Sequence, residues 1–339
     1  MKVLLLAGGD SSERTVSLES GRAVYEALNR LGHKVYAIDP SSGRSLLGSD
    51  GSFIEIKADT TAKQTSIQSS KSWSLSNALA SPGFTDIDVV FISLHGGSGE
   101  NGKIQCLLDL AGKKYTGSNM AASAIAMDKA VSKRLCASEN IPTPEWALYR
   151  TRGRKIDDRL VDEICHRFDY PIIVKPNDGG STIGLSKVDN EEQLLPALQK
   201  GVKESSDILV EKFVKGREIT AAILDNKSLP LVEIVPENDL YDFEAKYTKG
   251  KSDYIVPAEI SEEIATAIQE AALRIYNTIG ASGLIRVDFI LDEHGTFHFL
   301  ELNTLPGMTE LSLAPMAASA VGISFDDLIK RLIESALHR

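Results

Sequence analysis

The stretch of sequence that decides the fold spans residues 283–312 and reads GLIRVDFILDEHGTFHFLELNTLPGMTELS. Its first half alternates between apolar and charged residues, as a half-buried strand does. One face carries Ile285, Val287, Phe289 and Leu291, and the other carries Arg286 and Asp288. Turn residues follow at 292–295, and residues 296–303 alternate again, with Glu301 and Asn303 on a common face. The pattern predicts a β-hairpin.

This hairpin would bring Asp288, Glu301 and Asn303 together. Two carboxylates and an amide oxygen form a hard-oxygen cluster that suits Mg²⁺ or Mn²⁺ and not zinc. Mg²⁺ held by so few protein groups completes its shell with water and substrate phosphates, which points to a nucleotide. The alternative is an edge hairpin with a solvated polar face. The turn at Pro306-Gly307 favours the ligand site, because it offers bare backbone N–H groups beside the cluster.

Composition bounds the class of protein. The chain has 339 residues, of which 42% are hydrophobic and 25% charged, as in a soluble globular protein of two or three domains. A net charge of −10 argues against broad binding to nucleic acid or to an anionic membrane, so local Lys and Arg must meet any anionic ligand. The apolar run at the start of the sequence is too short for the core of a signal peptide, and we expect a cytoplasmic location. The three cysteines, Cys106, Cys136 and Cys165, lack a CxxC spacing and are expected to be free thiols.

The N-terminal third has the pattern of a parallel sheet covered by helices. Residues 2–7 form an apolar run, a helix follows with Val24, Leu28 and Leu31 on one face, and residues 35–39 give a second strand. The apolar run 87–94 predicts a further buried parallel strand. The loop 8–14 would lie at the carboxyl edge of this sheet, where open α/β folds place ligands. Glu13 is there either as a ligand or as an acid that complements the helix dipole.

A formal G-x-G-x-x-G occurs at Gly97, Gly99 and Gly102, but it is not a dinucleotide fingerprint. It follows a late strand, Glu100 would lie against a pyrophosphate, and no acid lies about 20 residues further on. We interpret the segment as a flexible ligand-facing loop in which His95 and Glu100 are polar contacts.

The rest of the chain predicts a second ligand region. One helix is expected at 121–140, with Lys129 and Lys133 on one side. A strand at 171–176 carries Lys175 and precedes the small residues 177–184, which suit a mobile phosphate-covering loop, with a plain hairpin turn as the alternative. A strand at 207–213 ends in a candidate interdomain hinge at Glu211-Lys212. The polar loop at 237–256 is long and is either a lid or merely exposed. The other expected elements are antiparallel strands at 217–224 and 229–235, a helix ending at Gly280, and a closing helix at 325–337.

Seven motifs occur in order: SSERTVSLESG, LHGGSGENGKIQ, YTGSNMAASAIAMDK, IVKPNDGGSTIG, EAKY, GLIRVDFILD and LELNTLPGMT. In this combination the chain resembles the D-alanine–D-alanine ligases of the ATP-grasp superfamily, over nearly its whole length except residues 41–84. The resemblance implies a mixed α/β and α+β architecture with an ATP-grasp fold. It also implies an N-terminal parallel, Rossmann-like α/β substrate domain at 1–117, a central ATP-grasp subdomain at 118–210, and a C-terminal subdomain with the metal and catalytic residues at 211–339.

The same resemblance implies roles for individual residues. ATP would be held by Lys129, Lys175, Ser181, Lys212, by Glu211 and the backbone of Val214 at the base, by Glu218 at the ribose and by Lys246 at the γ-phosphate. Asp288, Glu301 and Asn303 would bind two Mg²⁺ or Mn²⁺ ions. The first D-alanine would be met by Glu13, supported by Ser181 and Tyr247 with His95 close by, and the carboxylate of the second by Ser312 and Leu313. Arg286 and the Gly307 N–H would stabilise the oxyanion.

The implied reaction is ATP-dependent synthesis of D-alanyl-D-alanine for peptidoglycan precursors. ATP converts the carboxylate of one D-alanine to an acyl phosphate, the amine of the second attacks it, and ADP and phosphate are released. Water must be excluded, which gives the loop at 177–184 and the lid near Tyr247 a reason to close. The family also suggests a homodimer. Two alternatives remain open: a ligase that uses D-lactate as second substrate, and a nucleotide-binding regulator that has kept the fold without turnover.

Overall fold

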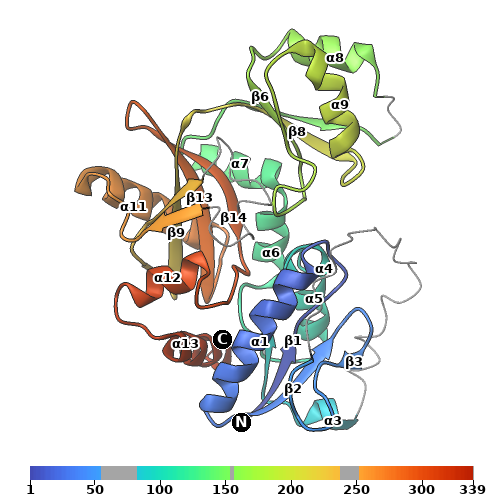
Figure 1. The fold of residues 1–339 in the computed structure, drawn as a ribbon, viewed down its shortest axis with the longest axis vertical. Helices are drawn as coiled ribbons and strands as arrows, with labels where there is room; N and C mark the ends of the chain where they lie inside the picture. Colours follow the sequence, from blue (N-terminus) through green and yellow to red (C-terminus); the bar gives the residue numbers. More distant parts are fainter. Residues whose placement is uncertain (55–81, 153–155, 237–251, 339) are drawn as a thin grey trace.

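The computed structural model of this protein describes residues 1–54, 82–152, 156–236 and 252–338. Within these ranges the longer strands form three sheets. Figure 1 shows the sheets in three lobes, with the N-terminal lobe at the bottom, the central lobe at the top and the C-terminal lobe at the left. No helix within the described ranges is long and apolar enough to cross a membrane.

The N-terminal sheet has the predicted parallel core. Its order is β3-β2-β1-β4, and β1 pairs in parallel with both β2 and β4, so the βαβ prediction is confirmed. The apolar runs in β1 and β4 are buried because two clusters of apolar side chains cover the two faces of the sheet. The elements of this part are β1 (Lys2–Leu6), α1 (Arg14–Arg30), β2 (Lys34–Asp39), β3 (Arg44–Ser45), α3 (Pro82–Thr85), β4 (Val89–Ile92), α4 (Gly97–Glu100) and α5 (Lys103–Leu110).

The single helix expected at 121–140 is wrong. The structure has two helices there, α6 (Met120–Met127) and α7 (Lys129–Ser138), separated at Asp128. Asp128 has extended backbone angles, and its carboxylate accepts a hydrogen bond from the Val131 N–H at 2.9 Å. Asp128 therefore caps the start of a new helix, a position at which aspartate is favoured. The break places Lys129 at the first position of α7.

The central lobe is a four-stranded antiparallel sheet of order β5-β8-β6-β7. Its core contains apolar side chains from the sheet and from α8 and α9. The elements are β5 (Trp146–Arg150), α8 (Asp158–Cys165), β6 (Ile172–Pro176), β7 (Ser186–Val188), α9 (Glu191–Gly201) and β8 (Asp207–Lys212).

The C-terminal sheet has the order β12-β11-β9-β13-β14, with β10 paired to β9, and every pairing is antiparallel. The long loop expected at 237–256 is wrong at its end, because residues 252–255 form β12 against β11. Residues 237–251, with Lys246 and Tyr247, lie outside the described residues. The elements are β9 (Gly216–Leu224), β10 (Lys227–Ser228), β11 (Val232–Pro236), β12 (Ser252–Ile255), α11 (Glu262–Thr278), β13 (Leu284–Asp292), β14 (Phe297–Asn303) and α12 (Leu313–Ser319).

The last helix, α13 (Phe325–Leu337), lies at the predicted residues and packs on the N-terminal lobe. Leu328 and Ile329 are fully buried in the same cluster as Val3 of β1, and Arg30 of α1 pairs with Asp326 at 2.7 Å. Both chain ends accordingly lie close together in Figure 1. The division at residues 117 and 210 stays a prediction, and the second boundary would fall inside β8.

Candidate active site

The hairpin of β13 and β14 has the predicted facing residues. Asp288 lies opposite Glu301, and Arg286 lies opposite Asn303. Beyond Asp288 the register shifts, because Phe289 pairs with Phe299 and Leu300 is an extra residue in β14. Such a bulge bends the strand and re-aims its side chains. The alternation thus predicted the hairpin correctly, and the irregularity lies next to the expected metal ligands.

The three expected metal ligands differ in their present partners. Asp288 is buried; its Oδ1 accepts a hydrogen bond from Thr220 Oγ1 at 2.7 Å, and its carboxylate is paired with Arg286 at 2.9 Å. Glu301 Oε2 lies 3.3 Å from Lys129 Nζ. Asn303 Oδ1 accepts the backbone N–H of Leu305 at 2.9 Å. Each ligand is therefore held by donors that fix its direction, and the all-oxygen set fits Mg²⁺ or Mn²⁺.

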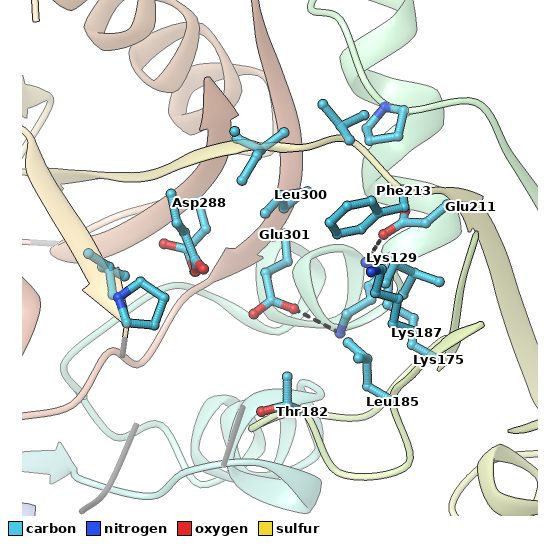
Figure 2. A pocket seen from close by; sticks show the side chains of 18 of the residues that line it. Lys129, Lys175, Thr182, Leu185, Lys187, Glu211, Phe213, Asp288, Leu300 and Glu301 are labelled. Atoms are coloured by element: carbon cyan, nitrogen blue, oxygen red, sulfur yellow. Dashed lines mark hydrogen bonds and ion pairs between the residues drawn. The ribbon is translucent and has the colours of Figure 1, made fainter. Parts of the chain in front are cut away.

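A cavity of about 530 Å³ lies between the central and C-terminal sheets (Figure 2). This volume is in the range of pockets that bind molecules of nucleotide size. The cavity wall includes eight of the residues expected at the nucleotide and metal: Lys129, Lys175, Glu211, Lys212, Val214, Glu218, Asp288 and Glu301. Residues up to 172 positions apart in the sequence, Lys129 and Glu301, thus meet around one space.

Lysine side chains face this cavity from two directions. Lys129, at the start of α7, donates to the Gly179 carbonyl at 2.5 Å and is paired with Glu301 (Figure 2). Lys175 on β6 donates to Glu211 Oε1 at 2.5 Å. Burial alone would raise the pKa of Glu211, but Lys133 and Lys175 outweigh it and lower that pKa. Glu211 is therefore an ionised carboxylate, and the wall carries the positive charge that phosphates require.

The loop at 177–184 joins β6 to its antiparallel neighbour β7, so it is a hairpin connection that also lines the cavity. Ser181 and Thr182 have φ angles of 49° and 59°, in the left-handed region that residues with a side chain seldom adopt. Consecutive strained residues of this kind gather at ligand sites. Thr182 lines the cavity, and its buried hydroxyl has no hydrogen-bond partner among the described residues. Thr182 was not predicted as a site residue from the sequence.

Glu13 joins the N-terminal lobe to the same loop. It stands at the start of α1, but its side chain makes no capping hydrogen bond and accepts one from the Ser181 hydroxyl instead. A side chain on Gly180 would place its Cβ 2.7 Å from Glu13 Oε2, and one on Gly96 would come closer still. The Glu13 carboxylate is thus closely enclosed by glycine backbone and bound to Ser181, and it does not cap the helix, which disfavours a purely helix-terminal role.

His95 is held in a network that reaches the C-terminal lobe. Its Nδ1 lies 3.0 Å from the Leu305 carbonyl, which can only accept, so Nδ1 carries the proton in this arrangement. Its Nε2 lies 2.9 Å from Ser20 Oγ, which also accepts the Met308 N–H at 3.2 Å. Glu100 lies 3.9 Å away, and burial raises the pKa of this carboxyl. His95 therefore fixes the turn that carries Gly307.

The expected site for the second substrate lies on that turn and at the start of α12. Ser312 Oγ accepts the Thr309 N–H at 3.1 Å, and Leu313 is buried. A Cβ on Gly307 would lie 2.9 Å from Ser312 Oγ, so any larger residue there would displace the Ser312 side chain. Arg286 donates to both oxygens of Asp288 in this structure. Its oxyanion role stays a prediction.

Three further polar residues were not predicted at the site: Lys133, Thr220 and Ser20. The sequence pattern placed Lys133 on the same side of a helix as Lys129 but gave it no role, and Thr220 follows Glu218 by two residues on β9, so the strand period could have indicated it. Ser20 gives no such signal, because its partner His95 lies 75 positions away. The three cysteines are free, as expected, and all lie in helices, but only Cys136 is fully buried.

Comparison with known proteins identifies the family. The family described as "D-ala D-ala ligase N-terminus" matches residues 2–118, and the one described as "D-ala D-ala ligase C-terminus" matches residues 135–334. The chain is 40% identical to the D-alanine–D-alanine ligase of Syntrophotalea carbinolica over 99% of this chain and 96% of the relative. It is 41% identical to that of Gloeobacter violaceus over 99% of this chain and 100% of the relative.

Solved structures agree. The crystal structure of D-alanine–D-alanine ligase from Bacillus anthracis matches with a TM-score of 0.77 and 30% identity, over 100% of this chain and 98% of the other. The same enzyme complexed with ATP matches with a TM-score of 0.77 and 28% identity, with the same coverage. The predicted ATP-grasp fold class is confirmed. The chain belongs to the D-alanine–D-alanine ligase family.

Proposed function

We propose that this protein joins two molecules of D-alanine into D-alanyl-D-alanine at the expense of ATP, for the synthesis of peptidoglycan precursors. One observation carries the proposal. In the loop at 177–184, Thr182 lines the nucleotide-sized cavity while its neighbour Ser181 is hydrogen-bonded to Glu13. The transferring end of ATP and the first amino acid would therefore meet across a single peptide unit.

Nucleotide binding would use the cavity wall. Lys129 and Lys175 would bind the phosphates. In this structure Lys129 is paired with Glu301 and the Gly179 carbonyl, and Lys175 with Glu211; phosphate oxygens would replace these partners. The Glu211–Val214 segment would hold the base, with Lys212 beside it, and Glu218 the ribose. Lys246, which lies outside the described residues, would reach the γ-phosphate.

Asp288, Glu301 and Asn303 would hold two Mg²⁺ or Mn²⁺ ions, since their oxygens form a hard donor set on one face of the hairpin. When bound, the ions would neutralise charge on the transferring phosphoryl group.

The first chemical step is attack by a carboxylate oxygen of D-alanine on the γ-phosphorus, which releases ADP and leaves an acyl phosphate. Glu13 would bind the ammonium group of this D-alanine, and Ser181 would hold the Glu13 carboxylate in place. His95 would support the turn at Leu305–Met308 through its contact with the Leu305 carbonyl and through Ser20, which accepts the Met308 N–H. Tyr247 would complete this end of the site from outside the described residues.

In the second step the amine of the second D-alanine, once deprotonated, attacks the acyl carbon, and phosphate leaves. Ser312 and Leu313 would orient its carboxylate at the start of α12. The Gly307 N–H and Arg286 would stabilise the oxyanion that forms on the acyl oxygen. Closure of the site against water protects the acyl phosphate from hydrolysis.

A phosphate-release assay tests the proposal. Phosphate should appear only when ATP, Mg²⁺ and D-alanine are all present, and the dipeptide should appear in equal amount. Binding of ATP without release would instead support the regulator. Comparing D-alanine with D-lactate as second substrate across pH separates the remaining alternative. A cytoplasmic location, where ATP is available, and a homodimer are parts of the same proposal.

A further inference from the structure

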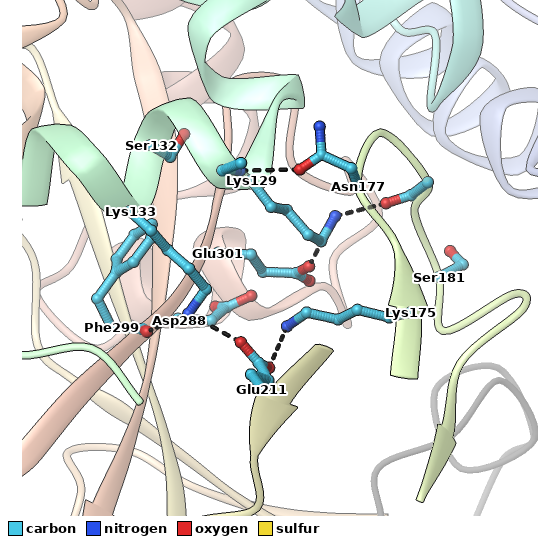
Figure 3. Close-up of polar contacts among 12 residues, drawn as sticks. Lys129, Ser132, Lys133, Lys175, Asn177, Ser181, Glu211, Asp288, Phe299 and Glu301 are labelled. Atoms are coloured by element: carbon cyan, nitrogen blue, oxygen red, sulfur yellow. Dashed lines mark hydrogen bonds and ion pairs between the residues drawn. The ribbon is translucent and has the colours of Figure 1, made fainter. Parts of the chain in front are cut away.

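Lys133 is a fully buried lysine that the proposed reaction does not use. It lies on α7, one turn beyond Lys129, and its side chain has 0% exposure. Its ammonium is 2.9 Å from Glu211 Oε2 and 2.6 Å from Thr143 Oγ1, and 3.4 Å from the Phe299 carbonyl (Figure 3). Burial lowers the pKa of Lys133 to about 8. A buried lysine is costly to a fold, so its position calls for a reason.

The reason lies in a row of three charges. Lys175 contacts Glu211 Oε1 from the cavity side, and Lys133 contacts Oε2 from behind (Figure 3). Lys175 and Glu211 line the cavity, whereas Lys133 does not belong to the wall that the described residues form. The three side chains come from β6, β8 and α7, so the row depends on tertiary packing.

The charges in this row decide what a nucleotide would meet. With Lys133 the row carries one net positive charge, and Glu211 divides its attraction between two ammonium groups. Without Lys133 the row would be neutral, and a buried, unpaired side of Glu211 would hold Lys175 more tightly. Lys175 would then be less available to a phosphate.

We infer that Lys133 is a positioning residue for ATP: it neutralises Glu211 from behind, which frees Lys175 to bind phosphate and keeps the Glu211 carboxylate directed along the base side of the cavity. This inference rests on the proposed nucleotide role of the cavity. It adds a residue that touches neither ATP nor D-alanine but sets the charge of two residues that line the nucleotide cavity.

A double-mutant cycle tests the inference. Lys133→Met removes the charge at nearly constant volume and should weaken ATP binding at least tenfold, while the KM for D-alanine changes less than twofold. In a Glu211→Gln background nothing remains to be neutralised, so the same substitution should change ATP affinity less than threefold. A purely structural role, in which Lys133 ties α7 to Thr143 and Phe299, predicts the same loss in both backgrounds and would overturn the inference.

Controls separate the possible failures. Thr143→Val removes another partner of Lys133 without changing charge, and it should leave ATP affinity within twofold of wild type. Should Lys133→Met not fold, Lys133→Gln keeps a polar head without charge and carries the same comparison. Affinity is measured by calorimetric titration of MgATP, independently of turnover. If the wild-type protein binds MgATP but releases no phosphate, the proposed ligase activity is contradicted, and the double-mutant cycle still tests the role of Lys133 in ATP binding. If the charge-free variants of Lys133 bind ATP within twofold of wild type, the inference is refuted.

Discussion

Replacement of Glu301 by Gln separates a catalytic role of the hairpin from a structural one. The side chain of Glu301 is 28% exposed, and its ion pair with Lys129 spans 3.3 Å. A partly exposed pair of this kind contributes about 0–1 kcal/mol to stability. Because the Gln amide oxygen can still accept from Lys129, unfolding should shift by no more than about 1 kcal/mol, or about 2–4 °C in melting temperature.

The effect on turnover should be far larger. Gln removes one of the two formal charges that the hairpin offers to the metal ions. Removing one preorganised electrostatic group from such a site typically costs about 10²–10³ in kcat, or about 3–4 kcal/mol. The expected result is therefore a protein that melts like wild type and releases phosphate at least about a hundredfold more slowly, and raising the Mg²⁺ concentration should recover part of the loss.

Glu293→Gln is the matched control, because the same substitution is made in the turn of the same hairpin, where the side chain is 82% exposed. This variant should keep wild-type rates and stability. Phosphate release with ATP and D-alanine, and thermal unfolding, are measured on both variants. Near-normal turnover in Glu301→Gln would refute the metal assignment, and a large loss of stability would show that the side chain is structural.

Three further predictions follow from contacts elsewhere in the molecule. Ser181→Ala removes a hydrogen bond to the Glu13 carboxylate, worth about 1.5–3 kcal/mol, and should raise the KM for the first D-alanine by about ten- to a hundredfold, clearly more than it raises the KM for ATP; equal changes in both would contradict the contact with the first substrate. Leu328→Ala opens a cavity under α13 and should lower the free energy of unfolding in urea by about 2–5 kcal/mol; a loss below 1 kcal/mol would show that α13 is not docked on the N-terminal lobe. Burial would raise the pKa of Asp39, but hydrogen bonds from Arg14 and Ser41 outweigh it and lower that pKa. The ionised carboxylate therefore stabilises the fold fully above the unfolded pKa of about 3.9, and this stabilisation is lost as pH falls through the lower folded pKa. The urea midpoint of the wild type should accordingly drop below about pH 4, and that of Asp39→Asn should drop less.

The parts of the fold that depend on local periodicity were predictable from sequence. The alternation from Ile285 to Asn303 indicated the hairpin and the facing of Asp288 and Glu301, because side chains in a strand alternate with a period of two. The bulge at Leu300 was not predictable, since it depends on packing against neighbouring strands. The break at Asp128 was missed because an aspartate is tolerated inside a helix and also caps one, and only the structure decides between the two.

The site required information that no local pattern holds. Ser181 and Glu13 are 168 positions apart, and their contact was expected only from the resemblance of motifs to a known family. The burial of Lys133 contradicts the usual preference of lysine for the surface, and it becomes intelligible only when Glu211 and Lys175 are seen around it. The spacing of charged residues in the sequence therefore does not indicate which of them lie together in the folded protein.

The position of the metal ions decides whether the β13–β14 hairpin is the catalytic centre. Crystals grown with ADP, Mn²⁺ and a phosphinate mimic of the acyl phosphate would locate manganese by its anomalous scattering. We expect two peaks beside the terminal phosphates, with oxygens of Asp288, Glu301 and Asn303 within about 2.0–2.6 Å of them. Manganese bound away from the β13–β14 hairpin, or nucleotide phosphates far from these three side chains, would contradict this expectation.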